Sequence, residues 1–496
     1  MHIAFATAEA LPYSKTGGLG DVSGALPHAL AELGHNVTVF TPYYRCAKRI
    51  DPKAPKIADG SVPVGGEIVP WTLHQSTIVK GPAKFYLIGH DGYFDREGLY
   101  TGPRGEYPDA INRFLFFSRA CLAAAQTLGQ PVDAWSCHDW QTALIPVYLR
   151  LAFFNHPFHS KAGTLFTIHN VSYQGHFWHW DWPLLNLPWK HYNWKELEFY
   201  GKINLLKGGL VFSDYINTVS PTYAKQIQTP EYGYGLDGLL GERATDLFGV
   251  INGIDMKIWD PLRDPHLPAK YSSKDLAGKA KDKAALLERF KLPGDANTPV
   301  LGLVGRLIEQ KGMDLIALAL EEIARRNVRL VVLGTGDPKF HELLERLQKL
   351  FPDRIAVQFT FDEDLAHLIQ AGSDIFLMPS RFEPCGLSQL YSLRYGTVPL
   401  VHATGGLVDT VTDVTPENLK AGTATGYSFS EYTHQALLAC LDRALKTYRE
   451  DKVTWKALQV RGMEQDWSWS RSAKAYAGIL EKAVAKAAAR AKTATT

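Results

Sequence analysis

The chain has 496 residues, of which 46% are hydrophobic and 21% charged, and its formal net charge is +2 at pH 7. This composition excludes a disordered chain, and the small net charge gives no reason to expect a nucleic-acid partner. The five cysteines form no C-x-x-C pair, so neither a disulfide framework nor a zinc knuckle is predicted. No signal peptide and no apolar run long enough for a membrane span are found, so we expect a cytoplasmic protein without a membrane partner.

Short β-branched segments alternate with helical patterns along the chain, an arrangement typical of parallel sheets covered by helices. In the first half we predict strands at 3–7, 37–41, 85–88, 134–137, 164–168, 215–219 and 248–251. In the second half the predicted strands are 300–304, 329–333, 355–359, 375–378 and 399–401. The fold class is therefore predicted to be α/β.

The strand pattern predicts two α/β domains in series, residues 1–250 and 251–466, followed by a terminal segment at 467–496. This segment reads as one long helix from Ser470 to about Lys492, and one option is that it crosses back onto the N-terminal domain. Ligands of open α/β sheets bind at the carboxyl ends of the strands. We therefore expect the site in a cleft between the two domains.

The first motif, Lys15-Thr-Gly-Gly-Leu-Gly-Asp-Val-Ser-Gly24, follows the first predicted strand and precedes a helix. Glycines before a helix let backbone N–H groups approach an anion, and the helix dipole favours negative charge there. The spacing fits neither a dinucleotide fingerprint nor a Walker sequence. The alternative is a tight turn whose glycines only serve packing.

The second motif places Arg306 and Lys311 between a predicted strand and a predicted helix. A positively charged lysine at a helix N-terminus interacts unfavourably with the helix dipole, and a bound anion beside it would offset this free-energy cost. A guanidinium fork and an ammonium group together suit the oxygens of a diphosphate. The alternative is a pair of ordinary surface cations.

The third and fourth motifs follow two later strands. In Arg381-Phe-Glu-Pro-Cys-Gly-Leu387, Glu383 is suited to face positive charge on a sugar ring, while the next N–H groups suit polar groups of a ligand. Thr404-Gly-Gly-Leu-Val-Asp409 repeats this loop-to-helix arrangement one strand later. Adjacent glycine-rich helix starts can converge on one phosphate.

Together and in this order, the four motifs resemble those of bacterial glycogen synthases and plant starch synthases, and the resemblance spans nearly the whole chain. It implies two Rossmann-like domains of the GT-B type with parallel sheets facing an interdomain cleft, and no required metal or other cofactor. The implied reaction transfers glucose from ADP-glucose to the non-reducing end of an α-1,4-glucan such as glycogen, with retention of configuration. The sequence is silent on the oligomeric state.

The resemblance also implies roles for individual residues. Glu383 would be the essential carboxylate, His169 would orient the reacting sugar, and Arg306 and Lys311 would neutralise the departing diphosphate. The donor-binding set would be Lys15, Gly17, Gly18, Asn252, Phe361, Cys385, Gly386, Leu387, Thr404, Gly405 and Gly406. Phe361 stands where the family often carries an adenine-stacking tyrosine. Asp21, Asp139 and Asn170 would contact acceptor or sugar hydroxyls.

Other interpretations stay open at this point. The donor could be UDP-glucose, or the chain could be a phosphorylase-like enzyme with pyridoxal phosphate, or a non-catalytic glucan-binding relative. Asp362-Glu-Asp364 matches a metal-binding D-x-D pattern, but helix capping is the favoured interpretation. The segment 176–200 is rich in tryptophan, and its rings suit either glucan binding or a packed core; they are Trp178, Trp180, Trp182, Trp189 and Trp194.

Overall fold

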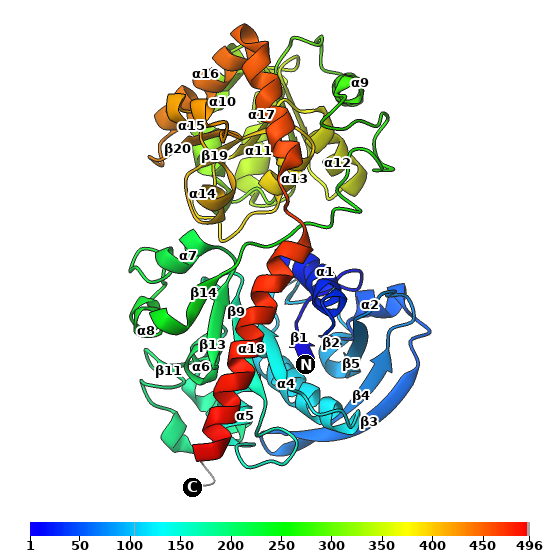
Figure 1. Ribbon diagram of the computed structural model, residues 1–496, viewed down its shortest axis with the longest axis vertical. Coiled ribbons are helices and arrows are strands. Elements are labelled where there is room, and N and C mark those ends of the chain that lie inside the picture. The colour runs from blue at the N-terminus through cyan, green and yellow to red at the C-terminus, as the bar shows by residue number, and fades with distance from the viewer. Residues whose placement is uncertain (104, 494–496) are drawn as a thin grey trace. The chain divides into compact units, whose positions relative to one another are not determined.

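The computed structural model describes residues 1–103 and 105–493 (Figure 1). The chain forms two compact units: unit 1 is Met1–Gly253 together with the C-terminal segment that begins at Trp469, and unit 2 is Ile254–Ser468. Both crossings between the units lie within a few residues of the predicted domain boundaries. No helix in the described residues is long and apolar enough to cross a membrane.

Unit 1 contains a nine-stranded sheet in the order β14-β13-β9-β8-β1-β2-β5-β4-β3. Its strands are β1 His2–Ala6, β2 Asn36–Pro42, β3 Lys56–Val64, β4 Glu67–Gln75, β5 Lys84–Gly89, β8 Ala134–His138, β9 Gly163–Ile168, β13 Tyr215–Thr218 and β14 Leu247–Gly249. Neighbouring strands from β14 to β5 pair in parallel, whereas β4 and β3 add an antiparallel hairpin. The strands predicted in the first half are confirmed, apart from small shifts at their ends.

The hairpin of β3 and β4 was missed. It turns at Gly65-Gly66, between segments whose apolar residues alternate. A two-glycine turn between such segments is a hairpin signal that the sequence already carried.

Helices cover both faces of the unit 1 sheet, because side chains of one strand point alternately to opposite faces. Ala4 and Ala6 of β1 belong to one hydrophobic cluster, together with α4, whereas Ile3 and Phe5 belong to another that includes α1 and α18. The helices are α1 Gly18–Glu32, α2 Arg45–Ile50, α3 Asp91–Phe94, α4 Ala110–Thr127, α5 Leu144–Leu151, α6 Leu205–Phe212, α7 Pro221–Gln226, α8 Asp237–Glu242 and α18 Trp469–Thr493.

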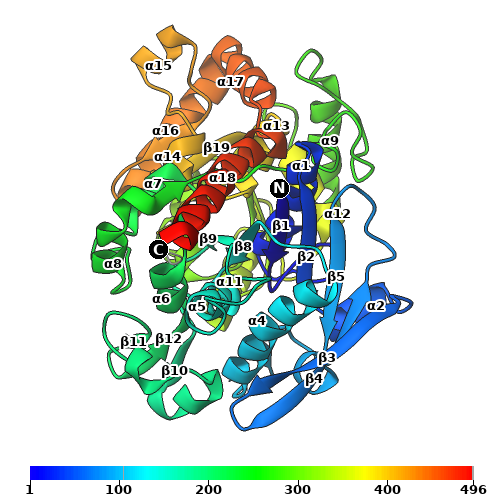
Figure 2. The same cartoon turned by 60° about the horizontal axis from the view of Figure 1, so that its bottom comes forward.

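The terminal helix α18 runs across the unit 1 sheet (Figures 1 and 2). Gly163 of β9 lies so close to α18 that an added Cβ would stand 2.5 Å from the carbonyl carbon of Ala483. Tyr476 accepts a hydrogen bond from Asn217 at 2.9 Å and is fully buried. The return of the helix to the N-terminal sheet is thus confirmed.

Smaller elements complete unit 1. The three-stranded sheet β10-β12-β11 consists of His176–Trp178, Lys202–Asn204 and Glu198–Phe199, and the two-stranded β6-β7 of Thr101–Gly102 and Gly105–Glu106. Short 3-10 helices are η1 Trp140–Thr142, η2 His179–Leu185, η3 Trp189–His191 and η4 Ala244–Asp246.

Unit 2 contains a six-stranded sheet in the order β17-β16-β15-β18-β19-β20, with every neighbouring pair parallel. The strands are β15 Val300–Val304, β16 Arg329–Leu333, β17 Ile355–Gln358, β18 Ile375–Met378, β19 Val398–His402 and β20 Tyr427–Phe429. The predicted strands of the second half are confirmed, and β20 was missed because three residues are too few to show a period.

Helices flank the unit 2 sheet on two faces as well, since Leu301 and Leu303 of β15 face one cluster and Val300 another. They are α9 Ala277–Arg289, α10 Met313–Arg325, α11 Pro338–Leu350, α12 Glu363–Gly372, α13 Ser388–Arg394, α14 Gly406–Thr410, α15 Pro416–Ala421, α16 His434–Glu450 and α17 Lys452–Glu464, with η5 at Glu309–Lys311. The predicted fold class, two α/β units with parallel sheets, is confirmed.

Candidate active site

In unit 1, most of the predicted site residues follow three neighbouring parallel strands. The Lys15 loop follows β1, Asp139 follows β8, and His169 and Asn170 follow β9, which are adjacent in the order β9-β8-β1. The carboxyl ends of parallel strands meet at one edge of a sheet. The fold therefore gathers these residues at a single edge.

Glu9 holds the Lys15 loop in place. Its carboxylate is 4% exposed and accepts hydrogen bonds from the Thr16 N–H and hydroxyl, both at 2.6 Å, from the Gly17 N–H at 3.3 Å, and from the Tyr100 hydroxyl at 2.8 Å. A buried carboxylate is tolerated when its oxygens are this well bonded. The predicted anion-binding N–H of Gly17 is thus already directed at Glu9. Sequence reasoning missed Glu9, although an acid directly between a strand and a glycine-rich loop was a usable signal.

Lys15 and Asp21 form an ion pair. The Nζ of Lys15 lies 2.7 Å from Oδ1 of Asp21, which stands in the first turn of α1, and the two side chains are 34% and 20% exposed. The predicted donor-binding cation and the predicted sugar-binding acid therefore neutralise each other in this structure. An anion that binds Lys15 has to compete with Asp21.

His169 and Asp139 form a hydrogen-bonded cluster with His138. Oδ1 of Asp139 accepts from the His169 backbone N–H at 2.7 Å, and Nε2 of His169 lies 2.9 Å from Nδ1 of His138. Burial raises the pKa of Asp139 to about 7 and lowers the pKa of His169 to about 3. His169 is consequently a neutral hydrogen-bonding group near pH 7. His138, which fixes the His169 ring, was given no role from the sequence.

The two predicted asparagines are placed differently. Oδ1 of Asn170 accepts from the backbone N–H and hydroxyl of Ser172, which closes a local turn at the end of β9. Asn252 is 4% exposed and follows β14, which β13 separates from β9. Within the described residues its Oδ1 has no hydrogen-bond partner. The structure therefore does not gather Asn252 with the residues that follow β1, β8 and β9.

In unit 2, Glu383 lies at the centre of a second cluster. It follows β18 and is 5% exposed; its Oε2 lies 2.7 Å from Nζ of Lys311 and accepts a hydrogen bond from the Ser380 hydroxyl at 3.0 Å. Lys311 belongs to the segment after β15, the neighbour of β18 in the sheet. The two strand ends thus bring the predicted essential carboxylate into contact with one predicted diphosphate-binding cation. Ser380 was not assigned a role from the sequence.

Arg306 is exposed in the same loop as Lys311. Among the described residues, its side chain donates a hydrogen bond of 3.3 Å to Oε1 of Gln310. By contrast, Arg381 is bound to Asp314 at 2.7 Å and packs over the ring of Tyr432. Arg306 is therefore the guanidinium of this cluster whose donors are available to an anionic ligand.

The loops after β18 and β19 touch each other. The Gly406 N–H donates to the carbonyl of Glu383 at 3.0 Å, and an added Cβ at Gly406 would clash with the carbonyl oxygen of Cys385. Gly386 and Gly405 have φ values of +74° and +47°, in the left-handed region that favours glycine. Leu387 and Thr404 stand at the starts of α13 and α14 beside them.

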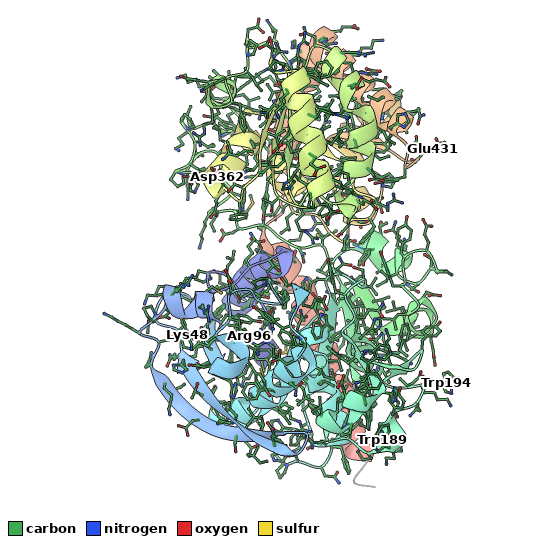
Figure 3. All side chains as sticks on the ribbon, turned by 180° about the vertical axis from the view of Figure 1, so that it is seen from behind. Lys48, Arg96, Trp189, Trp194, Asp362 and Glu431 are labelled. Carbon is green, nitrogen blue, oxygen red and sulfur yellow. The ribbon has the colours of Figure 1, made fainter. Side chains whose placement is uncertain are left out.

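Phe361 stands apart from this cluster. It follows β17, which β16 separates from β15, and 83% of the residue is exposed. Its neighbour Asp362, labelled in Figure 3, caps α12 by accepting from the Leu365 N–H at 2.9 Å. The capping interpretation of the D-x-D pattern is confirmed.

Comparisons with known proteins agree with this geometry. Residues 2–242 match the family model of the starch synthase catalytic domain, and residues 286–457 match that of glycosyl transferases group 1. The chain is 47% identical to a glycogen synthase from Koribacter versatilis, over 97% of this chain and 98% of that protein. It is 48% identical to one from Anaeromyxobacter dehalogenans, over 97% and 99%.

Solved structures show the same relationship. The catalytic domain of starch synthase IV from Arabidopsis thaliana, bound to ADP and acarbose, superposes with a TM-score of 0.90 at 32% identity, covering 98% of this chain and 99% of that one. Fold and site define the class of the protein as a glycosyltransferase of the GT-B type. Within that class, the chain belongs to the family of bacterial glycogen synthases and plant starch synthases. The predicted family and enzyme class are confirmed.

Proposed function

We propose that the chain transfers glucose from ADP-glucose to the non-reducing end of an α-1,4-glucan, with retention of configuration, and that it does so in the cytoplasm. The ADP and acarbose bound to the related starch synthase support this choice of donor and acceptor. The single observation that carries the proposal is the contact between the buried Glu383 and Lys311, with Arg306 exposed in the Lys311 loop.

The cations act on the departing diphosphate. As the bond between the glucose anomeric carbon and the diphosphate breaks, negative charge grows on the leaving oxygens. Arg306 and Lys311, already in place, stabilise that charge more in the transition state than in the ground state. Glu383 holds the ammonium group of Lys311 in position. Because the ammonium group already has one fixed partner, it loses little freedom when the diphosphate binds.

Glu383 faces the positive charge that develops on the sugar. Its second oxygen is not needed for the Lys311 and Ser380 contacts, which both use Oε2. The bond from the anomeric carbon to the diphosphate breaks, and the acceptor hydroxyl attacks from the face that the diphosphate leaves and passes its proton to the departing diphosphate oxygen, so that configuration is retained through an ion pair. In this proposal Glu383 forms no covalent bond to glucose, unlike the nucleophile of a retaining glycosidase. The N–H groups of Cys385, Gly386 and Leu387, with the Thr404–Gly406 loop, complete the donor site.

The residues at the unit 1 edge bind sugar hydroxyls in this proposal. The neutral ring of His169 is fixed by His138 and orients the reacting glucose, while Asp139 and Asn170 bind hydroxyls beside it. Lys15 contacts the donor when it separates from Asp21.

The test is a donor assay with glycogen as acceptor. We expect radiolabel to enter glycogen from ADP-glucose much faster than from UDP-glucose under equal conditions. Faster incorporation from UDP-glucose would refute adenine as the base of the donor nucleotide. The assay is needed because the exposed Phe361 does not determine which base is bound. A chain that binds glycogen but incorporates no label from either donor would contradict the proposed catalysis as a whole.

A further inference from the structure

Five large aromatic side chains are exposed on and around the small sheet β10-β12-β11 of unit 1. We call this set the tryptophan face; its members and their exposed fractions are Trp178 50%, Trp180 61%, Trp189 57%, Trp194 72% and Tyr200 84%. Trp189 and Trp194 are labelled on one flank of unit 1 in Figure 3. Exposed aromatic clusters of this kind mark binding surfaces more often than accidents of packing. The reaction proposed above leaves all five without a role.

The rings of Trp178, Trp180 and Trp189 are packed against other aromatic rings. Trp182, which is fully buried, packs against Trp189 with ring centroids 5.9 Å apart. Trp178 and Trp180 are stacked, with centroids 5.0 Å apart and an interplanar angle of 17°, and Nζ of Lys202 lies over Trp178 at 4.7 Å. A ligand that stacks on these three rings therefore orders few side chains, which lowers the entropic cost of binding.

The chemistry around the rings suits a sugar chain better than a protein partner. Charged groups stand among the rings: Lys190 and Lys195 are exposed, and the ammonium of Lys195 lies 5.4 Å from the Trp194 ring centre. Protein interfaces have few charged residues at their centre. Glucose units, in contrast, present an apolar face to an aromatic ring and hydroxyl groups to the polar side chains beside it.

The small sheet is fastened to the segment that carries the proposed acceptor residues. Phe177 of β10 packs on Trp140 with centroids 5.8 Å apart, and Trp140 directly follows Asp139. Gly175 approaches the same indole so closely that an added Cβ would stand 2.5 Å from a ring carbon. The tryptophan face is thus anchored, within unit 1, to the edge where Asp139 and His169 lie.

We propose that the tryptophan face is a second glucan-binding surface, separate from the reaction centre, which holds a distant stretch or another branch of the α-glucan acceptor. The inference rests on the proposed function, because it takes the acceptor to be an α-glucan. Glucose units stack on Trp180 and Trp194 and so hold the polymer on the enzyme. One chain end after another can then enter the reaction centre without release of the polymer.

The test separates long from short acceptors. In Trp180→Ala and Trp194→Ala we expect glycogen binding, measured by affinity electrophoresis, to weaken about 2- to 10-fold for each ring removed. The KM for glycogen should rise in parallel, while kcat and the KM for maltotriose stay as in the wild type. Trp180→Phe should keep part of the affinity. Phe154→Ala is the matched control, because Phe154 is 61% exposed on the segment after α5 and lies outside the tryptophan face.

Three outcomes would overturn the inference while leaving the proposed reaction intact. They are glycogen binding unchanged in both tryptophan variants, an equal rise of KM for maltotriose, and a change of sedimentation coefficient without a change in glycogen binding. The second would place the rings in the reaction centre, and the third would make the face a contact between copies of the chain. Loss of all glucosyl transfer in the wild type would instead refute the proposed function.

Discussion

At the scale of single residues, the site is built from charges that neutralise each other before any ligand binds. Lys311 pairs with Glu383 in unit 2, and Lys15 pairs with Asp21 in unit 1. Each cation was predicted to bind the donor, and each acid was predicted to face sugar. Pairing keeps each charged group oriented. It also avoids the free-energy cost of an unpaired charge, which is high for the buried Glu383.

Removing the Lys311 ammonium should reduce turnover more than donor binding. We expect Lys311→Ala to lower kcat on the order of 10²-fold, because the ammonium acts mainly on charge that develops in the transition state. The measurement is the initial rate at saturating ADP-glucose. Lys339→Ala is the control, since Lys339 is an exposed lysine paired with Glu309 near the same loop. Turnover like that of the wild type in Lys311→Ala would remove this residue from the proposed reaction.

The half-buried carboxyl of Asp139 should make stability depend on pH. Its pKa is raised to about 7, so between about pH 4 and 7 the folded chain holds a proton that the unfolded chain releases. The free energy of unfolding therefore decreases as the pH rises through that range, because ionisation of Asp139 is less favourable in the folded chain than in the unfolded chain. Asp139→Asn keeps the oxygen that accepts from the His169 N–H but cannot ionise.

We expect the melting temperature of Asp139→Asn, relative to the wild type, to increase from pH 4 to pH 7 and then to level off. Thermal unfolding followed by circular dichroism at several pH values checks this. A difference that is constant with pH would show that Asp139 ionises normally in the folded chain.

At the scale of elements, the strands were easier to predict from the sequence than the contacts made at their ends. The predicted strands are present, since alternating β-branched runs bounded by turns are a local signal. The small sheet β10-β12-β11 was missed because its strands are only two or three residues long, whereas the hairpin of β3 and β4 was missed although its Gly65-Gly66 turn was a usable signal. Glu9 was missed although it precedes the glycine-rich loop that it holds, and His138 was missed because its role depends on a contact with His169 after the neighbouring strand.

The docking of α18 on β9 depends on a glycine. Gly163→Ala would push a Cβ against the backbone of Ala483, so we expect a loss of about 1–3 kcal/mol in the free energy of unfolding. Gly478→Ala, on α18 itself, meets nothing within 4 Å and should leave stability unchanged or raise it by up to about 1 kcal/mol. Urea unfolding of both variants makes the comparison. Equal free energies of unfolding in the two variants would mean that α18 moves away from the added Cβ without a cost in free energy.

At the scale of the whole molecule, unit 1 is made from both ends of the chain. The segment from Trp469 contributes Trp469, Tyr476 and Leu480 to the hydrophobic cluster that also contains β1 and α1. Asp214, which is nearly buried, binds Arg490 of α18 at 2.6 Å and Arg150 at 2.6 Å. Unit 2, in contrast, is one continuous segment with its own clusters.

A chain that ends at Ser468 should therefore lose unit 1 but keep unit 2. Without α18, the apolar face of β1 and α1 is left open to water and Asp214 loses one of its two cations. We expect calorimetry of the truncated chain to show a weakened or absent transition for unit 1 and an unchanged one for unit 2. Two transitions at the wild-type temperatures would contradict this assignment.

The sequence by itself determined the fold class and the positions of most strands along the chain, because β-branched runs and glycine-rich turns are local properties. The resemblance of its four motifs pointed to the family. Only the tertiary structure decided which side chains meet. It paired Lys311 with Glu383, directed the Gly17 N–H to Glu9, left Phe361 exposed and turned the rings of the tryptophan face outward. Lys311 and Glu383 stand 72 positions apart in the chain, and only the packing of neighbouring strands and their loops brings them together.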